Sequence, residues 1–247
     1  MSDSLTADTI RTSGHNADEI EIYVARPQTA SPRGGVVVIH HLPGYDRSTK
    51  EIVRRFAEIG YDAVMPNLYS REGFDASPDD AAAAARAKGG IPDEQLIADV
   101  AAAAAYLRAL DTSNGKVGVI GYCSGGRQSV LSACNVELDA AVDCYGAFVT
   151  GTPPEGFPLK VTNLVDQLPN LRCPLLGLFG NDDSYPSPEQ VDELEQILSD
   201  LGKPHEFHRY DGAGHAFFSV DRPAFRPEAA VDGWEQIEHF YKTNLGG

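Results

Sequence analysis

Short apolar runs alternate along the chain with segments of helical periodicity. We expect strands at 20–26, 36–39, 61–65, 116–122, 138–145, 174–179 and 205–210, and the run VVVI at 36–39 is apolar throughout. A wholly apolar, β-branched run is typical of a strand covered on both faces. We expect helices at 49–59, 92–110, 125–134, 188–201 and 227–241. This alternation predicts an α/β fold, a doubly wound and mostly parallel sheet between helix layers.

One stretch lacks a clear period. The segment 150–172 is interrupted by prolines and glycines, and we expect it to form a long excursion above the sheet that acts as a partial lid. The alanine-rich pieces at 81–85 and 101–105 favour packed helices, because alanine is the best helix former. Without a repeat or a long linker, the chain is predicted to form a single domain over residues 1–247.

Charge and composition narrow the class of protein. The 247 residues carry a formal net charge of −16, which argues against nucleic-acid or membrane-surface partners because both are polyanionic. Four cysteines are too few for a disulfide scaffold. The start MSDSLTADTI lacks the basic and apolar blocks of a secretory signal, and no apolar run approaches the ~20 residues of a membrane span. We therefore expect a soluble, cytoplasmic globular protein.

The motif GYCSGG at 121–126 lies between an apolar strand and a predicted helix. It fits the nucleophile-elbow pattern G-x-S-x-G, with Cys123 in the place of the serine. Small residues at Gly121 and Gly125 permit a tight strand-to-helix turn that exposes the sulfur. The helix N-terminus favours the thiolate, and the amide of Ser124 points to where an oxyanion would form.

The partners that such a nucleophile needs follow in the order required of an α/β-hydrolase. The strand at 174–179 runs into GNDD, which places Asp182 and Asp183 at its carboxyl end. The strand at 205–210 runs into DGAGHAF, which places His215 on a glycine turn. Both positions are typical of active sites in open α/β sheets. A metal site at His205 and His208 is not expected, because i and i+3 residues of a strand point to opposite faces.

Together the motifs GYCSGG, FGNDD and GAGHAF resemble those of the dienelactone hydrolases, and so do IYVARP and GYDAVMPNLYSREG. The resemblance spans the chain from about residue 19 onward. It implies the α/β-hydrolase fold and a triad with Cys123 as nucleophile, Asp182 as orienting acid and His215 as base. Asp182 is chosen because the acid of the family lies two residues after the glycine that matches Gly180. The resemblance also implies an oxyanion hole made by the backbone amides of Leu42 and Ser124.

The same resemblance suggests substrate contacts, with two departures. Arg71 matches the first of two arginines that hold a substrate carboxylate in the family, but Ser219 stands where the second is expected. His41 occupies the place of a family glutamate, and its role is left open between structural and catalytic. We expect His41, Arg71 and Tyr122 to contact the substrate. We therefore expect the substrate to be an ester that differs from the dienelactone or carries less charge.

These expectations describe a cofactor-free and metal-free hydrolase of small-molecule esters or lactones, working as a monomer or small homo-oligomer. A general carboxylesterase or thioesterase shares every one of these parts. The alternative from another class is a non-catalytic relative that uses Cys123 as a redox or ligand-binding thiol. The presence of all three triad residues argues against that alternative, because an inactive relative is expected to lose at least one.

Overall fold

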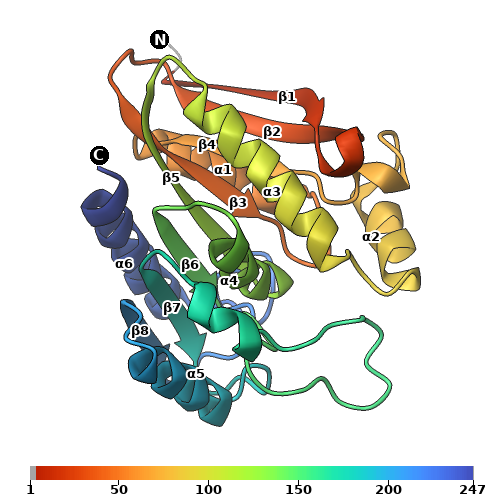
Figure 1. Cartoon of the computed structure of the whole chain (residues 1–247), viewed down its shortest axis with the longest axis vertical. Helices are drawn as coiled ribbons and strands as arrows, with labels where there is room; N and C mark the ends of the chain where they lie inside the picture. Colours follow the sequence, from red (N-terminus) through yellow and green to blue (C-terminus); the bar gives the residue numbers. More distant parts are fainter. Residues whose placement is uncertain (1–3, 247) are drawn as a thin grey trace.

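An eight-stranded sheet with helices on both faces forms the centre of the computed structural model, which describes residues 4–246 (Figure 1). The strand order is β1-β2-β4-β3-β5-β6-β7-β8. The pairs β1–β2 and β2–β4 are antiparallel, and every pair from β4 to β8 is parallel. The predicted doubly wound, mostly parallel α/β architecture is confirmed.

The elements follow one another in a regular alternation after the first two strands. The strands are β1 (Leu5–Ser13), β2 (Glu19–Pro27), β3 (Arg33–Ile39), β4 (Asp62–Pro66), β5 (Ser113–Tyr122), β6 (Ala140–Cys144), β7 (Leu175–Gly180) and β8 (His205–Tyr210). The helices are α1 (Arg47–Glu58), α2 (Pro78–Ala87), α3 (Asp93–Arg108), α4 (Ser124–Asn135), α5 (Pro188–Asp200) and α6 (Pro227–Leu245). Short 3-10 turns lie at η1 (His15–Ala17), η2 (Ser70–Glu72) and η3 (Val165–Asn170).

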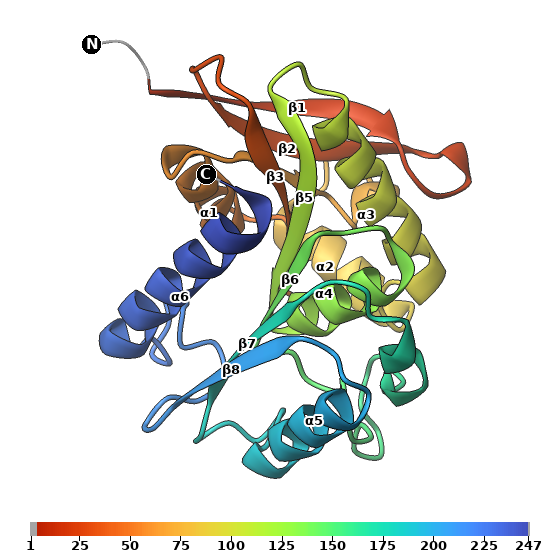
Figure 2. The ribbon, with the colours of Figure 1, turned by 60° about the vertical axis from the view of Figure 1, so that its left-hand side comes forward.

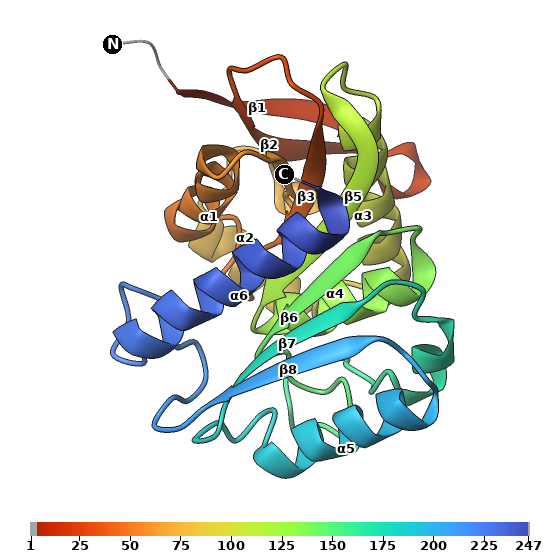
Figure 3. The ribbon, with the colours of Figure 1, turned by 90° about the vertical axis from the view of Figure 1, so that its left-hand side faces the viewer.

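Two apolar cores lie on the two faces of the sheet. In β3, Val37 and Ile39 join the core beneath α2, α3, α4 and α5, whereas Val36 and Val38 join the core beneath α1 and α6. Successive side chains of a strand point to opposite faces, so a run that is apolar throughout supplies both cores. The helices α1 and α6 cover one side of the sheet and α3 and α4 the other (Figures 2 and 3).

The expected strands and helices are found, including the alanine-rich α2, but β1 was not predicted. This strand pairs with β2 at the edge of the sheet, and most of its residues are exposed. An edge strand with so little burial has no apolar face to produce a period-two pattern, which is why LTADTIRTS gives no strand signal.

The loops that follow β3, β5, β7 and β8 gather at the carboxyl edge of the sheet. The strand order changes direction at β3, which lies between β4 on one side and β5 on the other. Open α/β sheets form a crevice at the carboxyl edge beside such a point. The predicted excursion runs without regular structure from 151 to 164 and then forms η3 (Figure 1). Within residues 4–246 no helix is both long and apolar enough to cross a membrane.

Candidate active site

Cys123 lies at the sharp turn between β5 and α4. Its backbone angles are φ 59° and ψ −122°, a left-handed conformation that residues other than glycine rarely adopt. A methyl group on Gly121 would overlap the carbonyl of Gly125, and one on Gly125 would lie 2.6 Å from the carbonyl oxygen of Ile39. The two glycines are therefore required by the close approach of helix and strands. The turn leaves the sulfur at the N-terminus of α4, where the helix dipole favours an anion.

His215 lies on the turn that follows β8 and reaches the sulfur. Its Nδ1 is 2.8 Å from Oδ2 of Asp183, and the ring is also hydrogen-bonded to Cys123. The imidazole packs edge-on against Tyr145, with ring centroids 5.2 Å apart. Thiol, imidazole and carboxylate thus form one continuous chain of contacts.

Asp183, and not the expected Asp182, is the carboxylate against His215. The side chain of Asp183 is buried, and its Oδ1 accepts a hydrogen bond of 2.9 Å from the amide of Tyr185. Asp182 is exposed, and its backbone amide donates to the carbonyl of Ala213 at 2.9 Å. The chain turns directly after Gly180, with the Asp183 amide bonded to the Gly180 carbonyl at 3.2 Å, and in this turn only Asp183 faces inward. The choice of Asp182 is wrong by one residue.

Two backbone amides converge on the sulfur of Cys123. Burial alone opposes ionisation of the thiol, but hydrogen bonds from His215 and from the amides of Ser124 and Leu42 lower the pKa of Cys123 below its ordinary value. Burial likewise opposes the charged form of His215, yet its bonds to Asp183 and Cys123 raise the pKa of His215 to about 10. The site therefore favours a thiolate beside an imidazolium.

The loop that carries Leu42 is fixed from beneath by His40 and Tyr69. The Tyr69 hydroxyl donates to the carbonyl of Leu42 at 2.9 Å, and the two rings pack edge-on at 4.8 Å. Burial lowers the pKa of His40 to about 4, so the imidazole is neutral. Its Nδ1 lies 2.9 Å from the carbonyl oxygen of His41, and Nε2 accepts from the amide of Leu68 at 3.2 Å. His40 is a structural residue that sets the position of the Leu42 amide.

A cavity of about 470 Å³ opens in front of Cys123 and His215. Phe148, Phe157 and Tyr185 form an aromatic cluster along its wall, with Phe148 5.1 Å from Phe157 and 5.5 Å from Tyr185 between ring centroids. This volume lies within the range of roughly 300–1,000 Å³ typical of small-molecule sites. We call it the catalytic cavity. Its other lining residues include Leu42, Tyr69, Ile91, Ser124, Arg127, Leu159, Lys160, Val161, Asp182 and Asp183.

The dienelactone hydrolase family model matches residues 20–245. The chain belongs to this family. A putative carboxymethylenebutenolidase of Escherichia coli strain K12 is 33% identical over 235 residues, covering 93% of this chain and 84% of the relative. One of Methylorubrum extorquens is 31% identical over 226 residues, covering 90% and 76%. The crystal structure of a putative dienelactone hydrolase from Klebsiella pneumoniae superposes with a TM-score of 0.82 at 27% identity, covering 97% of this chain and 99% of that one. The resemblance read from the motifs is confirmed, and the protein is a hydrolase with the α/β-hydrolase fold.

In this member of the dienelactone hydrolase family, Arg127 holds the excursion over the catalytic cavity. Its guanidinium pairs with both carboxylate oxygens of Asp93 at 3.1 Å, and its NH2 group donates to the carbonyl of Thr162 at 2.7 Å. The amide of Lys160 donates to the carbonyl of Gly89 at 2.7 Å. These bonds hold Phe157 and its neighbours at the wall of the cavity, and they occupy the Arg127 cation. Arg127 and Asp93 lie 34 residues apart, so no local pattern in the sequence reveals this pair.

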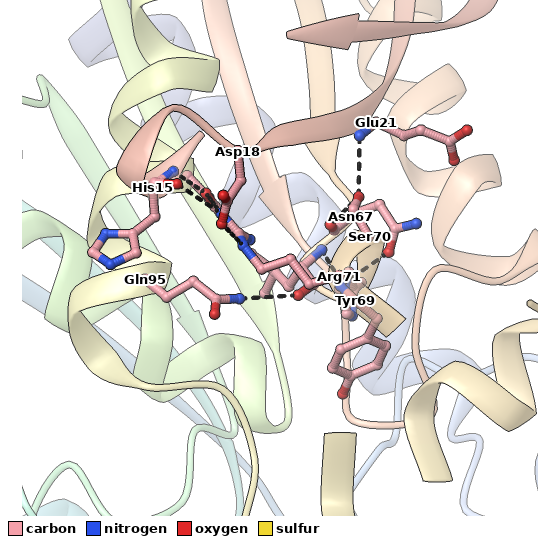
Figure 4. Close-up of polar contacts among 11 residues, drawn as sticks. His15, Asp18, Glu21, Asn67, Tyr69, Ser70, Arg71 and Gln95 are labelled. Atoms are coloured by element: carbon pink, nitrogen blue, oxygen red, sulfur yellow. Dashed lines mark hydrogen bonds and ion pairs between the residues drawn. The ribbon is translucent and has the colours of Figure 1, made fainter. Parts of the chain in front are cut away.

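Arg71, expected at the substrate, is instead bound inside the protein (Figure 4). Its guanidinium bonds both oxygens of Asp99 at 2.8 and 3.1 Å and one oxygen of Asp18 at 2.8 Å. Asp99 is fully buried, and its Oδ1 also accepts from the amide of His15. Arg71 therefore ties η1 and α3 together and does not line the catalytic cavity. The expectation is corrected, because a buried carboxylate that no sequence motif reveals takes the arginine.

His41 and Tyr122, the other two expected substrate contacts, line a second cavity behind the nucleophile. The Nε2 atom of His41 lies 2.6 Å from Oδ2 of Asp46, the residue that caps α1 through the amide of Thr49. Tyr122 is buried, since alternate residues of β5 face opposite sides of the sheet. Neither side chain borders the catalytic cavity, so their expected role there is not supported.

Asp143 is a buried carboxylate at the end of β6 that the sequence did not single out. It lies between Gly126 and Gly146, where any side chain on either glycine would strike its Oδ1, and this oxygen accepts from the Gly146 amide at 2.7 Å. Burial raises the pKa of Asp143 to about 7. It fixes the turn that leads to Phe148.

Within residues 4–246, no group of three or more His, Cys, Asp or Glu side chains is placed to hold a metal ion.

Brief treatment with iodoacetamide at neutral pH is expected to label Cys123 alone. Burial raises the pKa of Cys134 to about 11 and that of Cys173 to about 12, and it holds the Cys144 thiol well above its ordinary value. Only the Cys123 thiol has a lowered pKa. Mass mapping of the labelled protein provides the measurement, and dominant labelling of any other cysteine contradicts the prediction.

Replacing Arg71 by methionine is expected to lower the free energy of unfolding by about 3 kcal/mol, because Asp99 is left buried without its counter-charge. The double variant Arg71→Met/Asp99→Leu should recover part of the loss, while Arg172→Met at an exposed position should change it by less than about 0.5 kcal/mol. Urea unfolding measures all three. Unchanged stability in Arg71→Met, with weaker binding of an anionic ester, would return Arg71 to the substrate.

Proposed function

We propose that the protein hydrolyses carboxylic esters or lactones through a thioester formed on Cys123. The observation that carries the proposal is the convergence of the His215 imidazole and the Ser124 and Leu42 amides on one half-buried sulfur. The names of the relatives agree with it, since the similar proteins of E. coli and M. extorquens are described as putative carboxymethylenebutenolidases. In this proposal Asp183 takes the place of Asp182 as the orienting acid.

In the resting enzyme the proton lies on His215 and the negative charge on Cys123. Asp183 accepts the Nδ1–H bond and fixes the ring so that its other nitrogen addresses the sulfur. The thiolate is the nucleophilic form of cysteine, so no base has to remove a proton at the moment of attack.

Acylation begins when the sulfur bonds to the substrate carbonyl carbon, and the π electrons of the C=O bond move onto oxygen. The Leu42 and Ser124 amides hold the resulting oxyanion. When the C=O bond re-forms, the bond from carbon to the leaving oxygen breaks, and His215 gives that oxygen its proton. An ester thereby releases an alcohol, whereas the hydroxyl from an opened lactone stays attached to the acyl group.

Deacylation uses the neutral His215 left by the first half. The imidazole takes a proton from water, the hydroxide bonds to the thioester carbon, and the same amides hold the second oxyanion. Its collapse breaks the C–S bond and returns the thiolate beside the imidazolium. The acid product leaves with both oxygens, and no external reductant or oxidant enters the cycle.

The catalytic cavity indicates what the substrate carries. Its aromatic cluster of Phe148, Phe157 and Tyr185 favours an aryl or alkenyl group next to the carbonyl. Two basic side chains besides His215 border it, and the cation of Arg127 is already occupied by Asp93, which leaves Lys160 as the contact for a substrate anion. The proposed substrate class is therefore an apolar ester or lactone with at most one carboxylate.

A thiolate nucleophile is readily oxidised, and a reducing compartment protects it, so we place the enzyme in the cytoplasm.

Asp183→Asn is expected to lower turnover about a hundredfold or more, whereas Asp182→Asn, the matched control one residue away, should be mild. The Asp183 carboxylate raises the pKa of His215, and the imidazolium in turn lowers that of Cys123. Without the carboxylate, the pH midpoint of Cys123 alkylation should shift upward, toward that of an ordinary thiol. The opposite ranking of the two variants would restore Asp182 as the acid.

A panel of aryl esters, lactones and thioesters, tested on the wild type and on Cys123→Ala, examines the function itself. All turnover should disappear in the variant. In the wild type, rapid acid quench and mass spectrometry should trap a thioester adduct on Cys123. The relative rates distinguish a lactone hydrolase from a general carboxylesterase or thioesterase. Equal turnover by both proteins, or no turnover of any class by the wild type, would favour the non-catalytic thiol protein.

A further inference from the structure

A second cavity, of about 300 Å³, lies on the opposite side of the catalytic wall. The cavity is lined among others by Arg47, Arg55, Tyr122, Tyr145, Phe218 and Trp234, and it shares no lining residue with the catalytic cavity. The two spaces are separated by neighbouring residues of the same segments, such as Tyr122 and Cys123. We call this second cavity the rear cavity. Its volume is at the small end of ligand sites, roughly 300–1,000 Å³.

Aromatic side chains form most of the inner wall of the rear cavity. The ring of Phe218 lies edge-on to both Trp234 and Tyr122, with centroids 6.1 and 5.6 Å away. Tyr145 packs beside them, 6.2 Å from Phe218. Phe218 and Trp234 each keep a small exposed fraction and border the cavity, so a planar ring bound here would contact aromatic partners.

Two arginines and two carboxylates border the rear cavity, and Arg47 is the cation that a ligand could meet. Arg47 is exposed at the start of α1, and Arg55 stacks over Trp234 with its guanidinium carbon 3.8 Å from the ring centroid. The two carboxylates at the rim have other partners. Glu51 accepts from Arg54 at 3.0 Å, and Asp221 accepts from the Ser48 hydroxyl at 3.4 Å. Arg47 forms no ion pair with any residue in the described part of the chain, so its guanidinium is available to an anion.

One buried polar atom on this wall has no partner. The hydroxyl of Tyr122 forms no hydrogen bond with any described residue, although the side chain is 4% exposed. An unsatisfied buried hydroxyl is costly, and native proteins rarely keep one without an additional partner. The ring of Tyr122 borders the rear cavity, and its hydroxyl lies beneath the surface of that wall.

We propose that the rear cavity binds a small aromatic monocarboxylate, with the ring against Phe218 and Trp234 and the carboxylate at Arg47. The site is separate from the nucleophile, so binding does not depend on the proposed reaction. Tyr145 borders the rear cavity and packs against the His215 imidazole at 5.2 Å. A ligand that displaces Tyr145 therefore alters the position of His215, and this displacement changes kcat.

Trp234 is the single tryptophan of the chain and reports on the rear cavity directly. Phenylacetate, as the probe, is expected to change its fluorescence with a saturable titration. Phenylacetamide, the neutral analogue of the same shape, should bind at least about tenfold more weakly, because it lacks the charge for Arg47. Cys123→Ala should give the wild-type titration, which separates this result from any failure of the hydrolase proposal.

Arg47→Gln should weaken phenylacetate at least about tenfold, whereas Arg172→Gln and Lys160→Gln, with the same charge change elsewhere, should not. Ile52→Phe, which fills the rear cavity from α1, should abolish the titration while thermal unfolding shows the variant folded. In turnover assays, phenylacetate should change kcat at saturating ester. A fluorescence response that Arg47→Gln leaves unchanged, or purely competitive inhibition with no fluorescence change, would overturn the proposal.

Discussion

The close approach of α4 to β3 and β5 is the constraint on which the site depends. Gly121 and Gly125 leave no room for a side chain, and Cys123 takes a left-handed backbone conformation between them. Such a conformation costs of order 1–3 kcal/mol and persists only when its surroundings hold it. Here the cores on both faces of the sheet hold it, and the strained backbone presents a half-buried sulfur at a helix N-terminus.

A protein of net charge −16 keeps a local positive potential at that sulfur. The fixed dipoles of two backbone amides and of the N-terminus of α4 contribute to this potential. The His215 imidazolium, held by Asp183, adds a positive charge. Each part is positioned by groups further out. Tyr69 and His40 hold the loop of Leu42, and Asp183 is itself held by the Tyr185 amide. Preorganised groups of this kind need no rearrangement when charge develops on the substrate.

The sequence was sufficient for the fold and for most of the chain of catalytic contacts, because both leave local signals. The apolar run at 36–39 and the glycines around Cys123 are signals carried by adjacent residues. The failures concern side chains whose direction or partner is set by distant segments. The turn after β7 decides between Asp182 and Asp183 by which one faces inward, and Arg71 is captured by Asp99, 28 residues away. No local pattern carries that information.

The same reasoning explains why residues that flank the nucleophile in sequence lie on different cavities. Cys123 and Tyr122 are neighbours, but β5 directs Tyr122 to the face covered by α1 and α6, while the turn directs the sulfur to the carboxyl edge. Consecutive residues of one segment therefore border the two spaces. His215 and Tyr145 meet across the same wall. Any event in the rear cavity that moves Tyr145 consequently reaches the imidazole by direct contact, without a change in the sheet.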